Sequence, residues 1–273
     1  MKKPKSVIIF LVASIIALLQ ITPLITMALN SLRTGKEIES SMLGFPKTLH
    51  LENYIQTWIN GKYLISYGNN IIIGFFTVLI VVTVISCAAY GITKLNVYFK
   101  GFFMAYFVVS MSIPAFGIIV PLYFMLQKVG LINSHLGIIL IYSAIYIPFN
   151  FLLIRAFFVG VPKELEEAAC IDGCSELTTL LNVTLPLAKP IILTVSLIVF
   201  VSTWNEFLFS NTFLQDDNLR TVALRFYNFA GKYSTEYEKV FAAACISIMP
   251  IIFIYFGLQK SFIEGMTQGS MKG

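Results

Sequence analysis

The sequence predicts an all-α integral membrane protein, with six transmembrane helices and a cytoplasmic helix–turn–helix between the fourth and fifth. Two observations predict this fold class. Hydrophobic residues make up 57% of the 273 positions and charged residues only 12%, whereas a soluble domain carries about a quarter charged residues. In addition, six apolar stretches come close to, or exceed, the ~20 helical residues that cross a bilayer core.

These stretches are expected to be helices because lipid offers the backbone no hydrogen-bonding partner, and because they lack the alternation of barrel strands. Several contain proline, which a membrane bundle tolerates as a kink. The expected spans cover residues 6–31, about 71–92, about 102–126, about 136–154, about 191–214 and about 240–258.

The lysine-rich start of the chain suggests either a secretory signal peptide or a first span with a cytoplasmic N-terminus. The apolar run that follows is long for a signal peptide, and five more spans come after it, so a true span is favoured. Lys94 and Lys100 crowd the short loop that would share the cytoplasmic side. Six spans then return the C-terminus to the cytoplasm, and a cell membrane is the expected location.

The rest of the chain offers little besides this membrane domain. Residues 1–273 are expected to form one membrane bundle, with external segments at about 32–67 and 215–239. The first external segment suits a loop with a short interfacial helix. Cys170 and Cys174 have the helical spacing of a metal pair, but both histidines fall in expected external loops, so no metal site is predicted. No disulfide is expected either, because cytoplasmic thiols stay reduced.

The cytoplasmic segment at about 157–189 has helix signals on both sides of a turn. Pro162 suits a first helical position, and three glutamates directly after it favour the positive end of a helix dipole. Gly173 can take the left-handed conformation that ends a helix. Ser175 can cap a second short helix that ends before Pro186.

The first of these two helices carries a small apolar surface. Two interpretations remain open from the pattern alone: the surface enters a groove on another protein, or the helix packs beneath its own bundle. The residues concerned are Leu165, Ala168, Ala169 and Ile171.

The same segment resembles the EAA signature of permease subunits of ATP-binding-cassette (ABC) importers. The resemblance consists of Glu167-Ala168-Ala169, then Gly173, then Val183-Thr184-Leu185-Pro186 at the spacing of that family. It implies a type I ABC importer transmembrane domain, in which this segment docks into a cleft on an ATP-hydrolysing subunit. The residues to which it assigns this coupling are Glu167, Ala168, Ala169, Asp172, Gly173, Leu185 and Pro186.

Nearly the whole chain is similar to the carbohydrate-uptake branch of that family, and specifically to the smaller permease of maltose-type (multiple-sugar) importers. The motifs are Leu51-Glu52-Asn53-Tyr54, Trp204-Asn205-Glu206-Phe207 and the ending at residues 265–273. The resemblance implies that a cytoplasmic tail, about 260–273, reaches between two ATPase subunits, although its composition alone would favour disorder. The tail residues concerned are Gly265, Thr267, Gly269, Lys272 and Gly273.

Glu206 is the only acid well inside an expected span, where a charge costs roughly 2.5–3.5 kcal/mol. It is therefore expected to face the bundle interior, a cavity or the outer boundary. Trp204 and Asn205 could line a sugar path, or the group could fix packing near an external gate. Three further side chains are expected to form hydrogen bonds between helices: Asn69, Asn70 and Asn150.

No phosphate-binding loop of the form Gly-x-x-x-x-Gly-Lys-Ser/Thr occurs in the sequence. The chain is therefore expected to have no catalytic residues and no cofactor, with ATP bound by a partner subunit. An ion-coupled transporter would show several ionisable groups in the membrane, and an intramembrane enzyme would need a catalytic constellation there. The expected partners are a second, non-identical permease, two copies of an ATPase, an extracellular or periplasmic sugar-binding protein and membrane lipid, with no nucleic acid.

Overall fold

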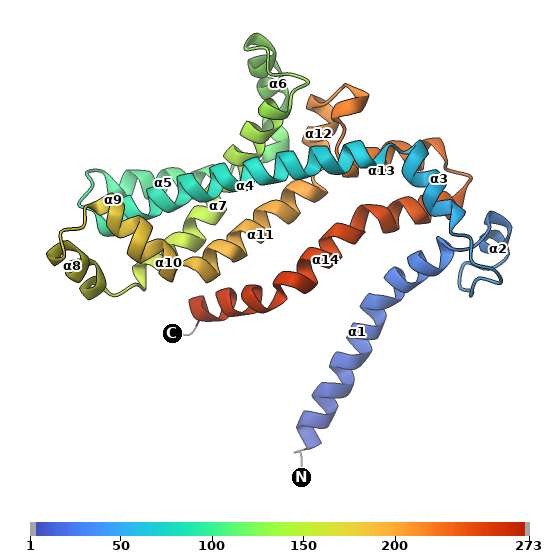
Figure 1. Ribbon diagram of the computed structural model, residues 1–273, viewed down its shortest axis with the longest axis horizontal. Coiled ribbons are helices and arrows are strands. Elements are labelled where there is room, and N and C mark those ends of the chain that lie inside the picture. The colour runs from blue at the N-terminus through green and yellow to red at the C-terminus, as the bar shows by residue number, and fades with distance from the viewer. Residues whose placement is uncertain (1–3, 271–273) are drawn as a thin grey trace. The chain divides into compact units, whose positions relative to one another are not determined.

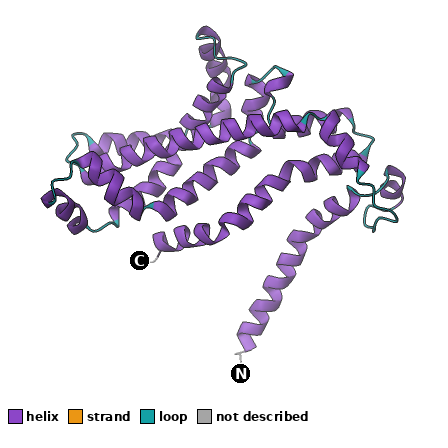
Figure 2. Ribbon diagram, viewed as in Figure 1, coloured by secondary structure: helices purple, strands orange, loops and turns teal. Residues whose placement is uncertain are grey.

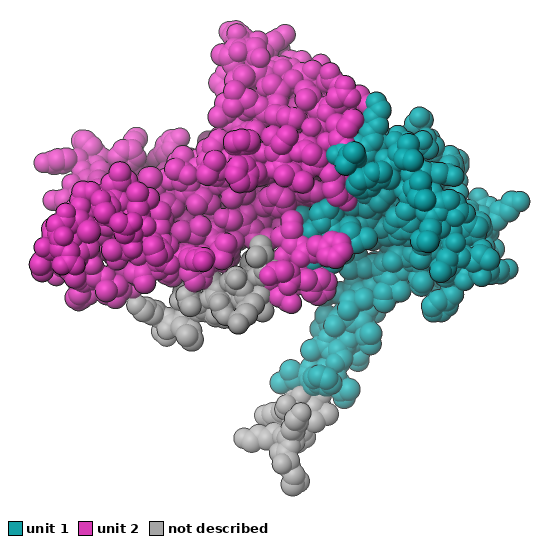
Figure 3. Space-filling model, viewed as in Figure 1, with its two compact units in different colours: residues 1–64, 222–252 teal, residues 65–221, 253–273 magenta. Residues whose placement is uncertain are grey.

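The computed structural model describes the backbone of residues 4–270, and the side chains of residues 9–257 and of Gln259. Within this range all regular structure is helical (Figure 2). The chain divides into two compact units, coloured separately in Figure 3. Unit 1 consists of Met1–Leu64 and Val222–Ile252, and unit 2 of Ile65–Thr221 and Phe253–Gly273.

Two long helices, α4 and α14, each contribute residues to both units, and the remaining helices belong to one unit each (Figure 1). Unit 1 contains α1 (Pro4–Asn30), α2 (Gly35–Ser40), α3 (Glu52–Asn60), α13 (Val222–Lys232), the start of α4 (Tyr63–Lys94) and the first part of α14 (Tyr237–Ser270). Unit 2 contains most of α4, then α5 (Lys100–Ser110), η1 (Ala115–Ile118), α6 (Ile119–Lys128), α7 (His135–Val159), α8 (Lys163–Ile171), α9 (Glu176–Thr179), η2 (Leu180–Thr184), α10 (Leu185–Leu187), α11 (Lys189–Asn205), α12 (Leu208–Phe213), η3 (Asp217–Leu219) and the end of α14.

The helices account for the expected membrane spans. Among the described residues, four helical stretches are by themselves long and apolar enough to cross a membrane: Ile9–Asn30, Tyr63–Lys94, His135–Val159 and Tyr237–Gly257. Two bent pairs raise the number to six if each pair is one span. These pairs are Lys100–Ser110 with Ala115–Lys128, bent by 90°, and Glu176–Leu187 with Lys189–Asn205, bent by 80°.

The third expected span, at about 102–126, has a sharp break where a proline kink was expected, because the chain bends by 90° between α5 and α6. α5 ends at Ser110, and Pro114 has an extended backbone with φ −67° and ψ 115° before η1 begins. Proline lacks an N–H, and its ring disfavours helical geometry at the residue before it, Ile113. By contrast, Pro23 and Pro148 lie inside α1 and α7 and do not end them.

The core of unit 2 joins α4, α7 and α11, which lie alongside one another (Figure 1). Ile85, Phe151 and Val195 contribute to one buried cluster, in which Phe107 of α5 stacks on Phe151 with ring centroids 3.9 Å apart. A second cluster joins α4, α6, α7 and α12. The scaffold of unit 2 is therefore held by apolar packing between helices far apart in the sequence.

Unit 1 contains the expected external segment, which is tied to the end of α1. The buried side chain of Asn53, on α3, donates to the backbone carbonyls of Ser31 and Arg33 at 2.9 and 3.0 Å. Thr34 and Glu37 form a reciprocal capping box at the start of α2. The expected short helix in this segment is confirmed as α3. Ile55 and Ile59 on this helix are exposed, and so is Leu51 just before it.

Candidate coupling segment and gate

The helix–turn–helix expected at about 157–189 is confirmed. α8 ends at Ile171, and Gly173 follows with φ +82°. The N–H of Gly173 donates to the Cys170 carbonyl at 3.0 Å and that of Cys174 to the Ala169 carbonyl at 2.9 Å. These two bonds form a Schellman turn, which requires a left-handed residue at the glycine position.

The N-terminal end of the first helix departs slightly from the expectation. Pro162 is the residue before the helix and not its first member, so α8 begins at Lys163. Asp172 caps the C-terminal end, its N–H donating to the Ala168 and Cys170 carbonyls. Glu164 and Glu166 lie in the first turn, where they complement the helix dipole.

The second arm continues past Pro186, so the prediction that its helix ends before that residue was wrong. Ser175 caps α9 as expected, its hydroxyl accepting from the Thr178 N–H at 3.3 Å. The chain then widens into the π-helical turn η2, where the Leu185 N–H donates to the carbonyl of Leu180, five residues back. Proline cannot donate to the carbonyl four residues before it, and the wider turn carries the chain through this position to a sharp bend before α11.

The apolar residues of α8 do not share one face. Ala169 is buried within the unit, whereas Glu167 and Ala168 are exposed and Ile171 is 87% exposed. The two interpretations of this surface therefore divide between residues. Ala169 packs beneath its own bundle, and Leu165, Ala168 and Ile171 are left accessible to another protein.

The C-terminal end of α4 contacts both arms of this segment. The Tyr90 hydroxyl donates to Glu176 Oε2 at 3.0 Å, and Lys94 Nζ lies 2.9 Å from Glu166 Oε1. Lys94 also donates to the Val161 carbonyl at 2.9 Å. A cavity of about 260 Å³ lies among these side chains.

Glu206 lies at a helix break and not within a span, which corrects the expected fifth span at about 191–214. α11 ends at Asn205, and α12 starts at Leu208. The Glu206 carboxylate accepts from the Tyr142 hydroxyl at 2.5 Å and from the N–H groups of Phe209 and Ser210 at 2.9 and 3.1 Å. The carboxylate thus satisfies donors at the N-terminus of α12, as an N-cap does.

Trp204 and Asn205 have opposite environments. The indole of Trp204 is buried and lies edge-on to the Tyr67 ring, with centroids 5.5 Å apart. Asn205 is exposed, and its amide donates to the Val201 carbonyl one turn back. Of the three residues proposed for a gate or pathway, Asn205 alone is exposed.

Two of the three asparagines join separate helices, as expected. Asn69 donates to the Asn218 and Arg220 carbonyls at 2.7 and 3.1 Å, and Asn70 donates to the Trp204 carbonyl at 3.3 Å. Asn150 instead donates to the Tyr146 carbonyl of its own helix, so the expectation was wrong for this residue.

The proposed ATPase-contacting tail is described only in part. The backbone at Gly265, Thr267 and Gly269 is helical, as part of α14, and Lys272 and Gly273 lie outside the described residues. All four cysteines are free, and the described residues contain no group of three His, Cys, Asp or Glu side chains that could hold a metal.

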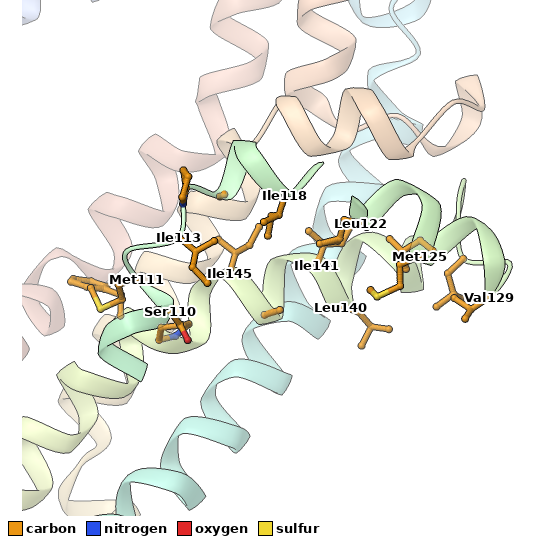
Figure 4. Close-up of a pocket in the computed structure, with 17 residues that line it drawn as sticks. Ser110, Met111, Ile113, Ile118, Leu122, Met125, Val129, Leu140, Ile141 and Ile145 are labelled. Carbon is orange, nitrogen blue, oxygen red and sulfur yellow. The ribbon is translucent and has the colours of Figure 1, made fainter. Parts of the chain in front are cut away.

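A large apolar cavity of about 830 Å³ opens beside the bend between α5 and α6 (Figure 4). Met111 lines it from the bend after α5, Ile118 from η1 and Leu122 from α6. Leu140 and Ile145 line it from α7. The sequence analysis did not predict this cavity, because it depends on the bend at Pro114.

The sequence analysis also missed Tyr90, Lys94 and Tyr142. Each side chain meets its acidic partner more than sixty positions away along the chain. A polar group near the end of a predicted span was the only local signal.

Comparison with known proteins identifies the family. Residues 82–268 match the family described as "Binding-protein-dependent transport system inner membrane component". A probable ABC transporter permease protein of Bacillus subtilis, YurM, is 35% identical over 98% of this chain and 88% of its own length. The melibiose/raffinose/stachyose import permease protein MelC of the same species is 32% identical over 97% and 96%.

A solved structure agrees with this assignment. It is a bacterial ABC transporter involved in the import of the acidic polysaccharide alginate, and one of its chains superposes with a TM-score of 0.80 at 26% identity, covering 94% of this chain and 96% of that chain. The matched family supplies the membrane component of such importers and not their ATPase. The chain therefore belongs to the binding-protein-dependent transport system inner membrane components, the permease subunits of ABC importers.

Proposed function

We propose that this permease forms half of the translocation pathway for a sugar or oligosaccharide. The relative that imports melibiose, raffinose and stachyose and the solved alginate importer both move saccharides. Both align with nearly the whole of this chain, so the likeness includes the membrane helices that would line a pathway.

The observation that carries the proposal is the turn at Gly173 between two short helices. The Schellman turn fixes the direction of the second arm, while Ala168 and Ile171 remain exposed on the first. An exposed apolar helix face is suited to a groove on another protein. We assign coupling to an ATPase to Glu167, Ala168, Ala169, Asp172, Gly173, Leu185 and Pro186, with Ala169 positioning α8 from within.

The partners follow from what this chain carries. It has membrane spans and a docking segment, and its sequence contains no phosphate-binding loop. The proposed complex therefore adds a second, different permease, two ATPase subunits that bind ATP, and an external sugar-binding protein. Both termini of this chain lie in the cytoplasm, and the tail at about 260–273 contacts the ATPase pair.

Near Glu206, the geometry favours a gate over a sugar contact. Hydrogen bonds from Tyr142, Phe209 and Ser210 already occupy the carboxylate. Glu206 therefore fixes the break between α11 and α12, and Trp204 supports it by packing. Asn205 is the member of this group with an exposed amide that a polyhydroxylated ligand could reach.

Reconstitution tests the function directly. The complete complex in proteoliposomes, supplied with binding protein and a panel of labelled mono- and oligosaccharides, should take up at least one sugar when ATP is present on the ATPase side. ADP, or omission of the ATPase subunit, should abolish uptake. Sugar uptake that persists without the ATPase and follows an ion gradient would contradict the proposal.

A further inference from the structure

One face of the last turns of α4 contacts both arms of the coupling segment. Tyr90 and Lys94 lie four residues apart, so their side chains share that face. Tyr90 donates to Glu176, the first residue of α9, and Lys94 pairs with Glu166 on α8. The two glutamates lie on opposite sides of the Gly173 turn.

The Lys94–Glu166 pair and the Tyr90 ring are largely shielded from water, whereas Glu176 is exposed. Tyr90 is 4% exposed, and the side chains of Lys94 and Glu166 are 5% and 16% exposed. Salt screens a shielded ion pair much less than an exposed one. Lys94 additionally holds the chain at the entry to α8 through the Val161 carbonyl.

Apolar packing contributes little to the attachment of α8. Ala169 is its one buried residue, and a cavity of about 260 Å³ separates parts of α8, α9 and α4. The contacts of Lys94 are therefore the main described connection between α8 and the end of α4. The second arm is held to α4 by the Tyr90–Glu176 bond together with Leu180, which packs in the same buried cluster as Tyr90.

The other end of α4 in unit 2 reaches the gate region. Asn70 donates to the Trp204 carbonyl, two residues before Glu206. The helix runs unbroken between Asn70 and Tyr90, a distance of about 30 Å at 1.5 Å per residue. One rigid helix thus connects the coupling segment to the break between α11 and α12.

We propose that Tyr90 and Lys94 form a latch through which movement of α8 and α9 is transmitted into α4 and so to the gate. The inference rests on the proposed function, in which an ATPase moves the coupling segment. Both are positioning residues, since they act through Glu176 and Glu166 and contact neither ATP nor sugar. A latch that holds both arms would make them move with α4 as one body.

The test measures sugar uptake and ATP hydrolysis together in the complete reconstituted complex. Tyr90→Phe removes only the hydroxyl, and Lys94→Met removes only the charge. Each should leave co-purification of the ATPase unchanged and lower the sugar taken up per ATP hydrolysed by about fivefold or more, the scale of a typical coupling between sites. Tyr98→Phe and Lys100→Met are matched controls from the connection to α5 and should behave as wild type.

A charge exchange keeps the proposal testable if a single charge reversal harms folding. Lys94→Glu should lose coupling, and the double variant Lys94→Glu, Glu166→Lys should regain much of it. Wild-type uptake per ATP in both Tyr90→Phe and Lys94→Met would overturn the latch, as would loss of uptake only in proportion to lost ATPase co-purification. Failure of the proposed function is distinct, because then the wild-type complex itself would show no ATP-dependent uptake.

Discussion

The Tyr142 hydroxyl on α7 donates to the Glu206 carboxylate, 64 residues further along the chain, at 2.5 Å. The same carboxylate accepts two backbone N–H groups at the start of α12. One acidic side chain therefore fixes both the break after α11 and the position of that break against α7.

Replacing Glu206 with glutamine should leave assembly largely intact and alter the transport rate. Glutamine keeps one acceptor oxygen, but its amide group would face an N–H or O–H donor, so the free energy of unfolding should fall by about 1–3 kcal/mol. Thermal unfolding of the purified complex and initial uptake rates measure the two effects.

Tyr142→Phe should give a similar loss of stability, and Tyr146→Phe is its matched control. Failure of Glu206→Gln to accumulate in the membrane would show that the residue serves packing alone.

The positions of the spans could be predicted because hydrophobicity along the chain reports lipid exposure directly. The breaks could not, because proline in a membrane helix either lies within a continuous helix, as at Pro148, or accompanies a bend of 90°, as near Pro114. Only packing around the proline decides between these outcomes.

In the coupling segment, Gly173 and Ser175 could be predicted because caps depend on local backbone geometry. The inward orientation of Glu166 could not, because it depends on Lys94 of α4, more than sixty residues earlier. The role of Glu206 was missed for the same reason, since its principal side-chain partner comes from α7.

The segment at residues 34–47 should lose order in acid. The Thr34 N–H donates to the Glu37 carboxylate and lowers the pKa of this group below its usual 4.5, and the Lys47 N–H lowers the pKa further. A pKa that is lower in the folded state contributes stability above pH 4.5, and this is lost as the pH falls through the folded-state pKa. Amide exchange of residues 34–47, corrected for intrinsic rates, should therefore accelerate below that pH.

Glu37→Gln should remove most of this acid dependence, whereas Glu39→Gln, on the exposed side of α2, should retain it. Equal acid dependence in the wild type and Glu37→Gln would show that the capping box does not control the order of this segment.

Deletion of residues 265–273 should lower ATP hydrolysis coupled to transport while membrane insertion remains intact. The expected reason is lost contact with the ATPase pair, where glycines allow close approach of the backbone. Uptake, ATP hydrolysis and the amount of complex in the membrane should be measured on the same preparation. Unchanged transport after the deletion would reject a role for the tail.

Substitutions on the exposed face of α8 should leave folding of the permease intact but impair docking of the ATPase. Ala168→Trp places a bulky group on an exposed position, so the permease should insert normally while the ATPase no longer seats. Ile171→Ser should weaken ATPase co-purification by removing an exposed apolar contact. Leu43→Ser, at a similarly exposed position in unit 1, is the control. Normal co-purification with both α8 variants would place the docking surface elsewhere.

The most direct test of coupling compares two glycines of the same backbone conformation. Gly173 has φ +82° and Gly130, after α6, has φ +69°, and a Cβ at either position would meet no described atom within 4 Å. Valine should cost each site at least about 1–2 kcal/mol of backbone strain. Sugar uptake and sugar-stimulated ATP hydrolysis should be abolished by Gly173→Val and largely preserved by Gly130→Val, in complexes inserted to equal amounts. Normal uptake by the Gly173→Val complex would contradict the claim that this segment couples ATP hydrolysis to transport.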